Sequence, residues 1–506
     1  MDLLKDPWIP VRSDGGMGTF HLLTYQQLLC EPGNWQVILS RDDLELACVQ
    51  LLVCMTQVMF LPEDDKVLRE RISKLLSPKE FAVGVRPCQD WFDLDHPTQP
   101  FMQSRGVNGK LTTVQKLLTG LPEQTSTAPS AHCFFNEITE VRRIGGTVAA
   151  IALFNLASNS PSFGGGFKGS LRGGAPITTL VCGKDLRDTV WHNVLTRPRL
   201  KERQIVMLGL PKDQPTWVKP VQEEAVIRWN DIGLLRGLFW QPARVELVKV
   251  EQLTSCDVLG GEAVSGYSGF RCEKFSFTVE GLWPHPHGTM TMNLKKGTLE
   301  HKFASFRTTA PAWTLLSEFV VPRGMNDPDA KEGSVPAGPI TQASELGEGN
   351  LHLLIGGYRA NQASVLERRH EMMSLAKGWS DDKERLSKLV GIGKAAKKAL
   401  RDKLYSAVQG DKHKGLKGIG AAIHETAEQL FYARTEGLIH ETFSNELTWK
   451  EWSVARSAFA NRIADHCQAI FRELADPYAM KPELIPIIAW TRRSLNNDLN
   501  KLVEEA

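Results

Sequence analysis

The stretch TWKEWSVARSAFANRIADHCQAIFREL (448–474) has apolar side chains at the spacing of one helix face. That stripe consists of Trp452, Ala455, Phe459, Ile463, Ile470 and Leu474. Thr448 followed three residues later by Glu451 has the form of a capping box, which predicts that the helix starts there. A long amphipathic helix is stable only when its stripe is buried against other elements, so partner helices are expected nearby.

Three neighbouring segments have the same pattern. Apolar residues recur every fourth position from Ile392 to Leu404, a second segment runs near 421–436, and a last one covers about 484–502. Proline becomes rare after about residue 364 and returns at Pro477. Four amphipathic helices joined by short links predict a C-terminal antiparallel four-helix bundle over residues 364–506.

The preceding residues, 1–363, mix short apolar runs with loops rich in glycine, proline and asparagine. TVAAIALF (147–154) is a candidate strand, and FSFTVEGLW (275–283) with MTMNLKKGTLEHKFASF (290–306) predicts an antiparallel hairpin or small sheet. Residues 323–350 are rich in Gly, Pro, Asp and Glu and predict a surface loop. The expected fold class is α+β: a large irregular mixed α/β N-terminal domain (1–363) followed by the bundle (364–506).

The composition excludes several classes of protein. With 506 residues and a net charge of +2, the chain is no uniformly basic nucleic-acid coat, although a local basic patch is compatible with that total. Nine scattered cysteines without a CxxC pair predict reduced thiols rather than a disulfide framework. The N-terminus lacks a secretory pattern. The apolar run 46–61 contains polar residues and follows Arg41-Asp42-Asp43, which predicts a buried helix of a cytoplasmic protein rather than a membrane span.

Positive charge is concentrated at the start of the predicted bundle. Residues 383–417 contain eleven Lys or Arg and three acids. Helical geometry places four of these on one face, opposite the apolar stripe: Lys394, Lys397, Lys398 and Arg401. A solvated lysine face is the ordinary explanation. We favour contact with a polyanion, because the basic row continues to Lys417 with little compensating acid nearby in the sequence.

The segment SFGGGFKGSLRGGAP (162–176) has six glycines beside Lys168 and Arg172. Residues 164–169 fit GxGxxG, but no strand leads directly into them, and SLRGGAP, which follows Gly169, cannot start a helix of normal length, so the context of a dinucleotide site is missing. A Walker A loop is excluded because Ser170 stands where lysine is required. By itself the segment predicts a structural loop, and a nucleotide-binding enzyme using residues 164–169 is kept as the alternative function.

Other candidate sites are weaker. WPHPH (283–287) places two histidines together, for which a packed or hydrogen-bonded pair at a turn is expected rather than a metal site. GGYRANQASVLERRH (356–370) taken alone predicts a polar turn leading into a helix, with amides that suit base edges. No nucleophile, paired-carboxylate or metal motif has credible context, so we expect no catalysis, no cofactor and no metal.

Taken together, these stretches resemble the CasA family, the large subunit of the type I-E CRISPR surveillance complex Cascade. The resemblance extends in family order over nearly the whole chain, and its stretches include DPWIPVR (6–12), PFMQ (100–103), FGGGFKGSLRGG (163–174), RGLFWQPA (236–243), EKFSFTVEGLWPHPH (273–287), GGYRANQASVLERRH (356–370) and HETAE (424–428). It implies a non-catalytic subunit that recognises the protospacer-adjacent motif (PAM) of double-stranded DNA from the minor groove and promotes duplex opening.

The resemblance also implies partners and site residues. The partners are target DNA, the 5′ handle of the guide RNA, the backbone, handle-binding and small subunits of Cascade, and a recruited helicase-nuclease. The family's PAM-contacting positions match Gly164, Gly165, Gly166, Lys274, Asn361, Gln362 and Ala363. A further family loop matches Phe134 and Asn136, near the guide handle or PAM. Lys168, Arg172 and the basic face would then contact DNA non-specifically. A bare scaffold without DNA contacts is a third possibility.

The sequence departs from some family members in its cysteines. Those members have cysteine pairs where this chain reads ITEVRRIGG (138–146) and SCDVLGGEA (255–263). Both pairs are missing, so no zinc is expected.

Overall fold

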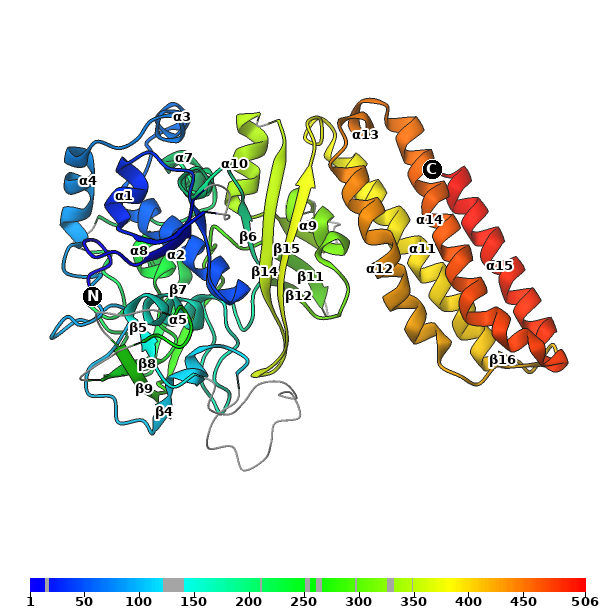
Figure 1. Cartoon of the computed structure of the whole chain (residues 1–506), viewed down its shortest axis with the longest axis horizontal. Helices are drawn as coiled ribbons and strands as arrows, with labels where there is room; N and C mark the ends of the chain where they lie inside the picture. The colour runs from blue at the N-terminus through cyan, green and yellow to red at the C-terminus, as the bar shows by residue number, and fades with distance from the viewer. Residues whose placement is uncertain are drawn as a thin grey trace. The chain divides into compact units, whose positions relative to one another are not determined.

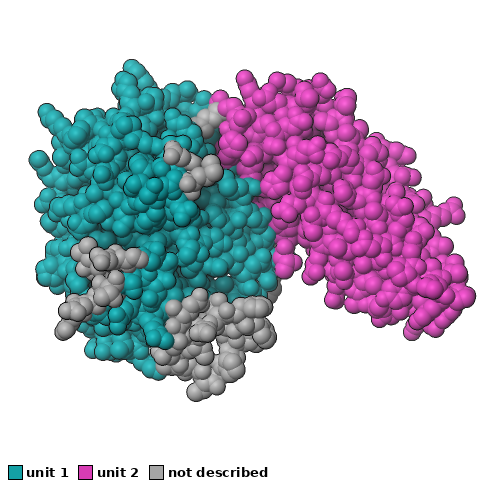
Figure 2. Space-filling view, in the orientation of Figure 1, with its two compact units in different colours: residues 1–308, 322–346, 353–372 teal, residues 309–321, 347–352, 373–506 magenta. Residues whose placement is uncertain are grey.

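The computed structural model of the chain describes residues 1–13, 18–121, 141–209, 212–250, 255–260, 266–295, 298–324, 332–347 and 349–506. These residues form two compact units (Figure 2). Unit 1 comprises Met1–Thr308, Pro322–Leu346 and Leu353–Met372, and unit 2 comprises Thr309–Val321, Gly347–His352 and Met373–Ala506. The boundary expected after residue 363 falls at the tip of a hairpin that belongs to unit 1.

The core of unit 1 is built around two buried helices, α2 (Asp42–Met59) and α5 (Gly146–Ser158), which pack against each other. Acidic side chains in the first turn of α2 suit the positive end of the helix dipole. The predicted buried helix over 46–61 is therefore confirmed. The candidate strand at 147–154 was wrong: it lies inside α5, because a short apolar run does not distinguish a strand from a buried helix.

The remaining helices of unit 1 are short and lie around this core (Figure 1). They are α1 (Tyr25–Cys30), α3 (Asp65–Ser73), α4 (Pro78–Val85), α6 (Leu186–His192), α7 (Arg197–Glu202), α8 (Leu234–Leu238) and α10 (Gly338–Leu346). The surface loop expected at 323–350 is thus partly wrong, since α10 and strand β13 (Glu332–Val335) lie within that range. Among the described residues, no helix combines the length and apolar character needed to cross a membrane.

Small sheets complete unit 1. Strand β9 (Gly266–Glu273) pairs with β8 (Arg244–Lys249) along one edge and with β4 (Leu111–Thr113) and β5 (Ile144–Gly145) along the other. A second sheet has the order β15-β14-β6, from β15 (Ser364–Leu375), β14 (Leu351–Asn361) and β6 (Thr178–Val181). The others combine β1 (Ile9–Arg12), β2 (Phe20–Leu23) and β3 (Gln36–Val37); β7 (Ala225–Arg228) and β10 (Phe277–Glu280); and β11 (Met290–Lys295), β12 (Thr298–Phe303) and β13.

Two strand predictions need correction. Residues 275–283 do not pair with 290–306: β10 pairs in parallel with β7, and the antiparallel hairpin is β11–β12, which lies entirely within 290–306. Residues 356–370 form no helix, because they are parts of β14 and β15. The alternating side chains suit a strand, and glycine at 357 permits a close approach, because a Cβ there would lie 2.8 Å from the Pro176 carbonyl oxygen. One pairing partner of β14, β6, is far away in the sequence.

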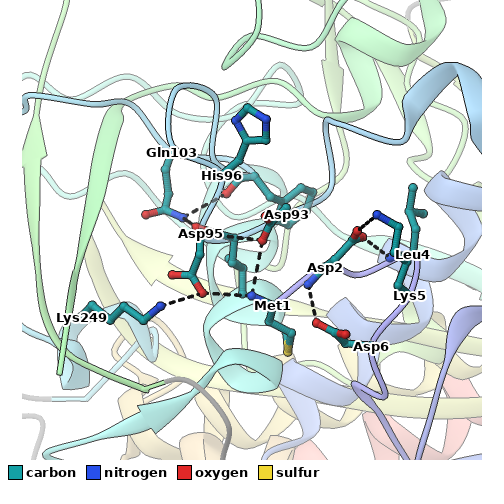
Figure 3. Close-up of polar contacts among 12 residues, drawn as sticks. Met1, Asp2, Leu4, Lys5, Asp6, Asp93, Asp95, His96, Gln103 and Lys249 are labelled. Carbon is teal, nitrogen blue, oxygen red and sulfur yellow. Dashed lines mark hydrogen bonds and ion pairs between the residues drawn. The ribbon is translucent and has the colours of Figure 1, made fainter. Parts of the chain in front are cut away.

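The N-terminal residues are anchored to the loop that follows residue 92 (Figure 3). The amino group of Met1 contacts Asp93 Oδ1 at 3.4 Å and Asp95 Oδ2 at 2.9 Å. Asp95 also receives Lys249 Nζ at 3.2 Å and the Tyr267 hydroxyl at 3.0 Å, from β8 and β9. These contacts join the N-terminal residues to the β8–β9 sheet.

Unit 2 confirms the helical C-terminus of the predicted fold class. Its four long helices lie side by side: α11 (Lys383–Gln409), α12 (Ile423–Phe443), α14 (Trp452–Ala475) and α15 (Ile485–Glu504) (Figure 1). Helix α11 contacts each of the other three. Short elements connect or flank them: β16 (Gly410–Asp411), β17 (Leu416–Lys417), α13 (Glu446–Lys450) and α9 (Leu316–Val320).

The predicted capping box at Thr448 was wrong. Thr448 is buried inside α13, whose N-cap is Asn445, and Glu451 itself is the N-cap of α14. The stripe named from the sequence is confirmed in part: Phe459, Ile463 and Ile470 are buried, whereas Trp452, Ala455 and Leu474 are half-buried.

Candidate nucleic-acid interface

The glycine loop, defined here as residues 163–169, joins α5 to β6. Gly164, Gly165 and Gly166 have φ angles of 76°, 53° and 89°, which L-residues with side chains adopt only at an energetic cost. A hydrogen bond from the Phe167 amide to the Gly164 carbonyl closes the turn at 2.9 Å. Gly165 and Gly166 are exposed, so the loop presents bare backbone at the surface of unit 1.

Lys274 lies against this backbone. It directly follows β9, its side chain is exposed, and its Nζ donates a hydrogen bond of 2.9 Å to the Gly165 carbonyl. A Cβ atom added to Gly166 would lie 3.4 Å from the same Nζ, at ordinary contact distance. The chain thus holds an ammonium group beside the exposed glycines, although 109 residues separate the two in the sequence.

The tip of the β14–β15 hairpin also lies against the loop. Gln362 and Ala363 connect the strands, and Gln362 has a φ of 54°, as the turn of a tight hairpin requires. Its side chain is exposed. A Cβ on Gly164 would lie 3.2 Å from the Ala363 Cβ. An ion pair of 2.8 Å between Arg359 and Glu367 links the two strands near the tip.

Three elements named from the sequence therefore meet: the glycine loop, Lys274 and the hairpin tip around Asn361, Gln362 and Ala363. We call this convergence the loop–hairpin site. Lys168 is exposed at its edge. Lys116 was not among the predicted residues, but its Nζ lies 5.3 Å from the ring centroid of Phe163 and adds positive charge next to the loop.

Arg172 has a different role from the one expected. It is 4% exposed, and its guanidinium donates to Asn159 Oδ1 at 2.6 Å, the Ser158 carbonyl at 3.0 Å and Thr178 Oγ1 at 3.0 Å. Burial lowers its pKa to about 9. A guanidinium that faces inward cannot contact DNA, so we remove Arg172 from the predicted contacts and assign it to holding the ends of the loop together.

The basic face of α11 is partly neutralised by α12. Lys397 Nζ contacts Glu428 Oε1 at 2.9 Å, and Arg401 lies 3.6 Å from the other oxygen. Burial raises the pKa of Glu428, but hydrogen bonds from Lys397 and Tyr432, with the charges of Lys397 and Arg401, together lower that pKa overall. Lys394 and Lys398 are exposed, and no ion pair is found for either among the described residues. The compensating acid that seemed to be missing comes from a neighbouring helix.

The two histidines of WPHPH form the packed pair that the sequence predicts. The rings of His285 and His287 are 5.2 Å apart, and the His287 amide donates to His285 Nδ1 at 3.1 Å. Both are buried. Burial, reinforced by the charges of Arg172 and Arg203, lowers the pKa of His287 to about 3. Among the described residues, no group of three or more His, Cys, Asp or Glu is placed to hold a metal ion.

Two further predictions concern the loop at 134–146 and the cysteines. Phe134 and Asn136 lie outside the described residues. At the end of this range, the backbone amides of Arg142 and Arg143 both donate to Asp257 Oδ2 at 2.8 Å, and both arginines are exposed. The eight cysteines within the described residues are all free thiols.

The structure gives little support to a nucleotide site at residues 164–169. A phosphate-binding glycine loop leads from a strand into a helix, whereas this loop leads from helix α5 to strand β6. The pocket beneath it, lined largely by apolar residues such as Leu153, Phe163 and Pro242, has a volume of about 20 Å³. That is room for about one water molecule.

The fold of this chain is similar to that of solved CRISPR-associated proteins. Thermobifida fusca Cse1 superposes with a TM-score of 0.74 at 15% identity, covering 100% of this chain and 98% of the other. Thermus thermophilus CasA (Cse1) gives 0.69 at 16% identity, covering 99% of each chain. A chain of a structure described as a CRISPR RNA-guided surveillance complex gives 0.63 at 14% identity, covering 98% and 99%.

The sequence itself matches the family model described as CRISPR-associated protein Cse1 over residues 2–469. This chain therefore belongs to the Cse1 family, and the resemblance to CasA is confirmed.

Proposed function

We propose that this protein is the non-catalytic large subunit of a type I-E Cascade complex, and that it recognises the PAM of double-stranded DNA from the minor groove. The observation that carries the proposal is the loop–hairpin site. Bare glycine backbone, a lysine ammonium and an exposed amide side chain come from three distant parts of the chain and meet at one surface point.

The chemistry of each element fits the minor groove. The groove is only about 6 Å wide, so a backbone that enters it must lack side chains, as Gly165 and Gly166 do. Lys274 can donate to the base-edge acceptors that line the groove floor. Because those acceptors are similar in A·T and T·A pairs, readout by this site is degenerate. The protein should accordingly accept several related PAMs.

The hairpin tip would open the duplex. Gln362 and Ala363 project where the strands turn, so a side chain there can displace a base pair next to the PAM. Unstacking costs a few kcal/mol per step, which pairing between guide RNA and target strand offsets. R-loop formation would start at this point. Exposed Lys168, Lys394 and Lys398, with Lys397 and Arg401 beside them, would add contacts to DNA phosphates.

The partners proposed are target DNA, the 5′ handle of the guide RNA, the backbone, handle-binding and small subunits of Cascade, and a recruited helicase-nuclease, all in the cytoplasm. Their support is family membership together with the similarity to a chain of an RNA-guided surveillance complex. Phe134 and Asn136 remain the proposed positions near the guide handle or PAM.

The test is a binding titration of reconstituted complex against target duplexes that differ only in the flanking trinucleotide. We expect a strong preference for a small set of related flanks, and a loss of that preference in the variants Lys274→Ala and Gln362→Ala. Lys74→Ala is the matched control, because Lys74 is an exposed lysine of unit 1 with a single described ion pair, to Glu70 at 2.9 Å.

The alternatives give different results. A bare scaffold predicts that neither Lys274→Ala nor Gln362→Ala changes DNA binding. A nucleotide-dependent enzyme predicts that the isolated chain binds a nucleotide and that Gly165→Asp abolishes this binding. Equal affinity for all flanks in the parental complex would refute PAM recognition.

A further inference from the structure

We propose that a buried hydrogen-bond network around Asp43 fixes the hairpin tip and the glycine loop relative to each other, and thereby sets how sharply the site discriminates between flanking sequences. This inference rests on the function proposed above. The members of the network, called the Asp43 network here, are Arg41, Asp43, Asn155, Asn159, Arg172 and Tyr358.

The hairpin enters the network through Tyr358. This residue lies in β14, four positions before Gln362, and is 1% exposed. Its hydroxyl donates to Asp43 Oδ2 at 2.7 Å and accepts from Asn155 Nδ2 at 2.6 Å. Asp43 lies in the first turn of α2 and Asn155 in α5. The strand that carries the hairpin tip is thus bonded to both core helices through one hydroxyl.

The glycine loop is connected to the Asp43 network through Asn159 and Arg172. Asn159, the residue that follows α5, donates from Nδ2 to Asn155 Oδ1 at 3.1 Å. Its own Oδ1 accepts from Arg172 Nη2 at 2.6 Å and from Thr178 Oγ1 at 3.0 Å. Ser158 and Asn159 precede the loop, whereas Arg172 and Thr178 follow it, so these bonds close the loop at its base.

Two arginines balance the charge of Asp43: Arg368 of β15, whose Nη1 lies 3.4 Å from Asp43 Oδ1, and Arg41. The Nε and Nη2 atoms of Arg41 bond the two oxygens of Asp43 at 3.0 and 2.7 Å, and Nη2 also donates to the Thr119 carbonyl at 2.7 Å. A two-pronged contact of this kind fixes the carboxylate plane and therefore the direction in which it accepts from Tyr358.

Because these groups are buried, the network favours one position of the hairpin relative to the glycine loop. Asp43, Asn155, Asn159, Arg172 and Tyr358 are each at most 7% exposed. Water cannot replace a broken bond at such positions, so a shift of the hairpin against the loop leaves a polar group unpaired. Strand pairing between Gly356 of β14 and Thr178 of β6 reinforces the same link. We infer that Tyr358 is a positioning residue for DNA recognition, although it cannot itself reach DNA.

The test is Tyr358→Phe, which removes one oxygen atom and keeps the ring. In the assembled complex, the ratio of dissociation constants for disfavoured and favoured flanks should fall by about 2- to 30-fold, the range of effects seen for residues that act through a network. Hydrogen exchange of the amides in 163–170 and 358–366 should become faster. Incorporation of the variant into the complex should be unchanged.

The matched control is Tyr25→Phe. Tyr25 is fully buried in the same unit, and its hydroxyl makes a 2.9 Å hydrogen bond to Thr56. Loss of this hydroxyl also destabilises the unit, but it should leave the discrimination ratio at the parental value. A general loss of stability would lower the ratio in both variants, and that result would overturn the proposal.

Two further measurements separate the possible failures. Tyr358→Phe combined with Gln362→Ala should lose little more than Gln362→Ala alone, since both act through the hairpin tip. Arg172→Lys keeps the charge but not the forked contacts. It should lower the ratio of dissociation constants in the same way, and it replaces Tyr358→Phe as the test if that variant does not assemble.

The network proposal alone is refuted if the parental complex discriminates between flanks, Lys274→Ala abolishes this discrimination, and the network variants keep the parental ratio. A parental complex without flank preference overturns both proposals.

Discussion

A substitution at Gly165 should have two separable effects, one on stability through backbone strain and one on DNA binding. Its φ is 53°, and a Cβ built on it meets no atom within 4 Å. Gly165→Ala should therefore fold with a cost of about 1–2 kcal/mol for the left-handed conformation. In the assembled complex, the added methyl group should weaken binding to a favoured target at least about tenfold, because it occupies space in a narrow groove. Denaturant unfolding and DNA titration measure the two effects.

Gly106→Ala is the control for that strain. Gly106 is exposed, has a φ of 70° and likewise has open space around its Cβ position. Its substitution should lower stability by a similar amount and leave DNA binding unchanged. Equal losses of DNA binding in both variants would assign the effect at Gly165 to strain.

A second prediction for a single residue is that His287 makes the stability of the protein depend on pH. The pKa of this buried imidazole is lowered from 6.5 to about 3. Between these values the unfolded chain holds the proton and the folded chain does not, so the free energy of unfolding falls as pH is lowered through this window. The expected slope is about 1.4 kcal/mol per pH unit for this one group. The contribution of His287 to stability should be fully present above pH 7.

The measurement compares urea unfolding at pH 7.5 and pH 5.0 for the parent and His287→Gln. The variant should show a smaller difference between the two pH values, whatever its absolute stability. His413→Gln removes an exposed imidazole and serves as the reference. An unchanged difference in His287→Gln would show that this ring is not the source of acid sensitivity.

At the scale of elements, the neighbours of α11 decide which of its cations are available. Lys394 and Lys398 are exposed, whereas Lys397 and Arg401 share Glu428 of α12. The variant Lys394→Ala/Lys398→Ala should reduce the salt dependence of DNA binding by the complex. The slope of log K against log salt should become shallower by about 0.9 for each phosphate that is no longer neutralised. Glu428→Gln should strengthen binding at low salt, because it releases two cations.

An unchanged salt dependence would show that the basic face of α11 is only a solvated surface. If neither variant alters the salt dependence, the face serves solubility alone and the predicted polyanion contact is wrong. Lys450→Ala is a suitable control, since Lys450 is exposed in the same unit and pairs with Glu446 at 2.9 Å.

Elements differ in how far they could be predicted. Helices α11, α12, α14 and α15 follow from local apolar periodicity, which packing in a bundle preserves. Residues 356–370 gave the wrong prediction, because the turn Gln362-Ala363 lacks the Asn-Gly or Asp-Gly pair that marks a hairpin in a sequence. The other partner of β14, β6, is more than 170 residues away. The start of α14 was misplaced because Thr448 is buried in α13 instead of exposed at a helix end.

At the scale of the whole molecule, unit 2 includes Thr309–Val321, a segment that is separate in sequence from its long helices. Trp313 of this segment is 2% exposed, and a Cβ on Gly393 of α11 would lie 2.8 Å from its ring. Its ring also lies edge-on to Tyr432 of α12, at 6.2 Å. Glycine at position 393 thus provides the space that this tryptophan fills.

Trp313→Ala should therefore destabilise unit 2 by about 3–5 kcal/mol, because apolar burial is removed and a cavity is left behind. Chemical unfolding followed by far-ultraviolet circular dichroism measures this change in the full chain. Trp490→Ala is the comparison, because Trp490 lies on α15 of the same unit and is 38% exposed. Similar small effects from both variants would mean that Trp313 is not part of the bundle core.

Four features could be predicted without any coordinates: the helical C-terminus, the buried helix α2, the histidine pair and the family. Each depends on local periodicity or on motifs in a fixed order. Three others emerge only in the folded chain: Lys274 lies on Gly165, Arg172 faces inward, and Glu428 neutralises part of α11. Burial and ion pairing depend on which distant residues come close together. Such contacts between distant residues cannot be predicted from a residue and its immediate neighbours in the sequence.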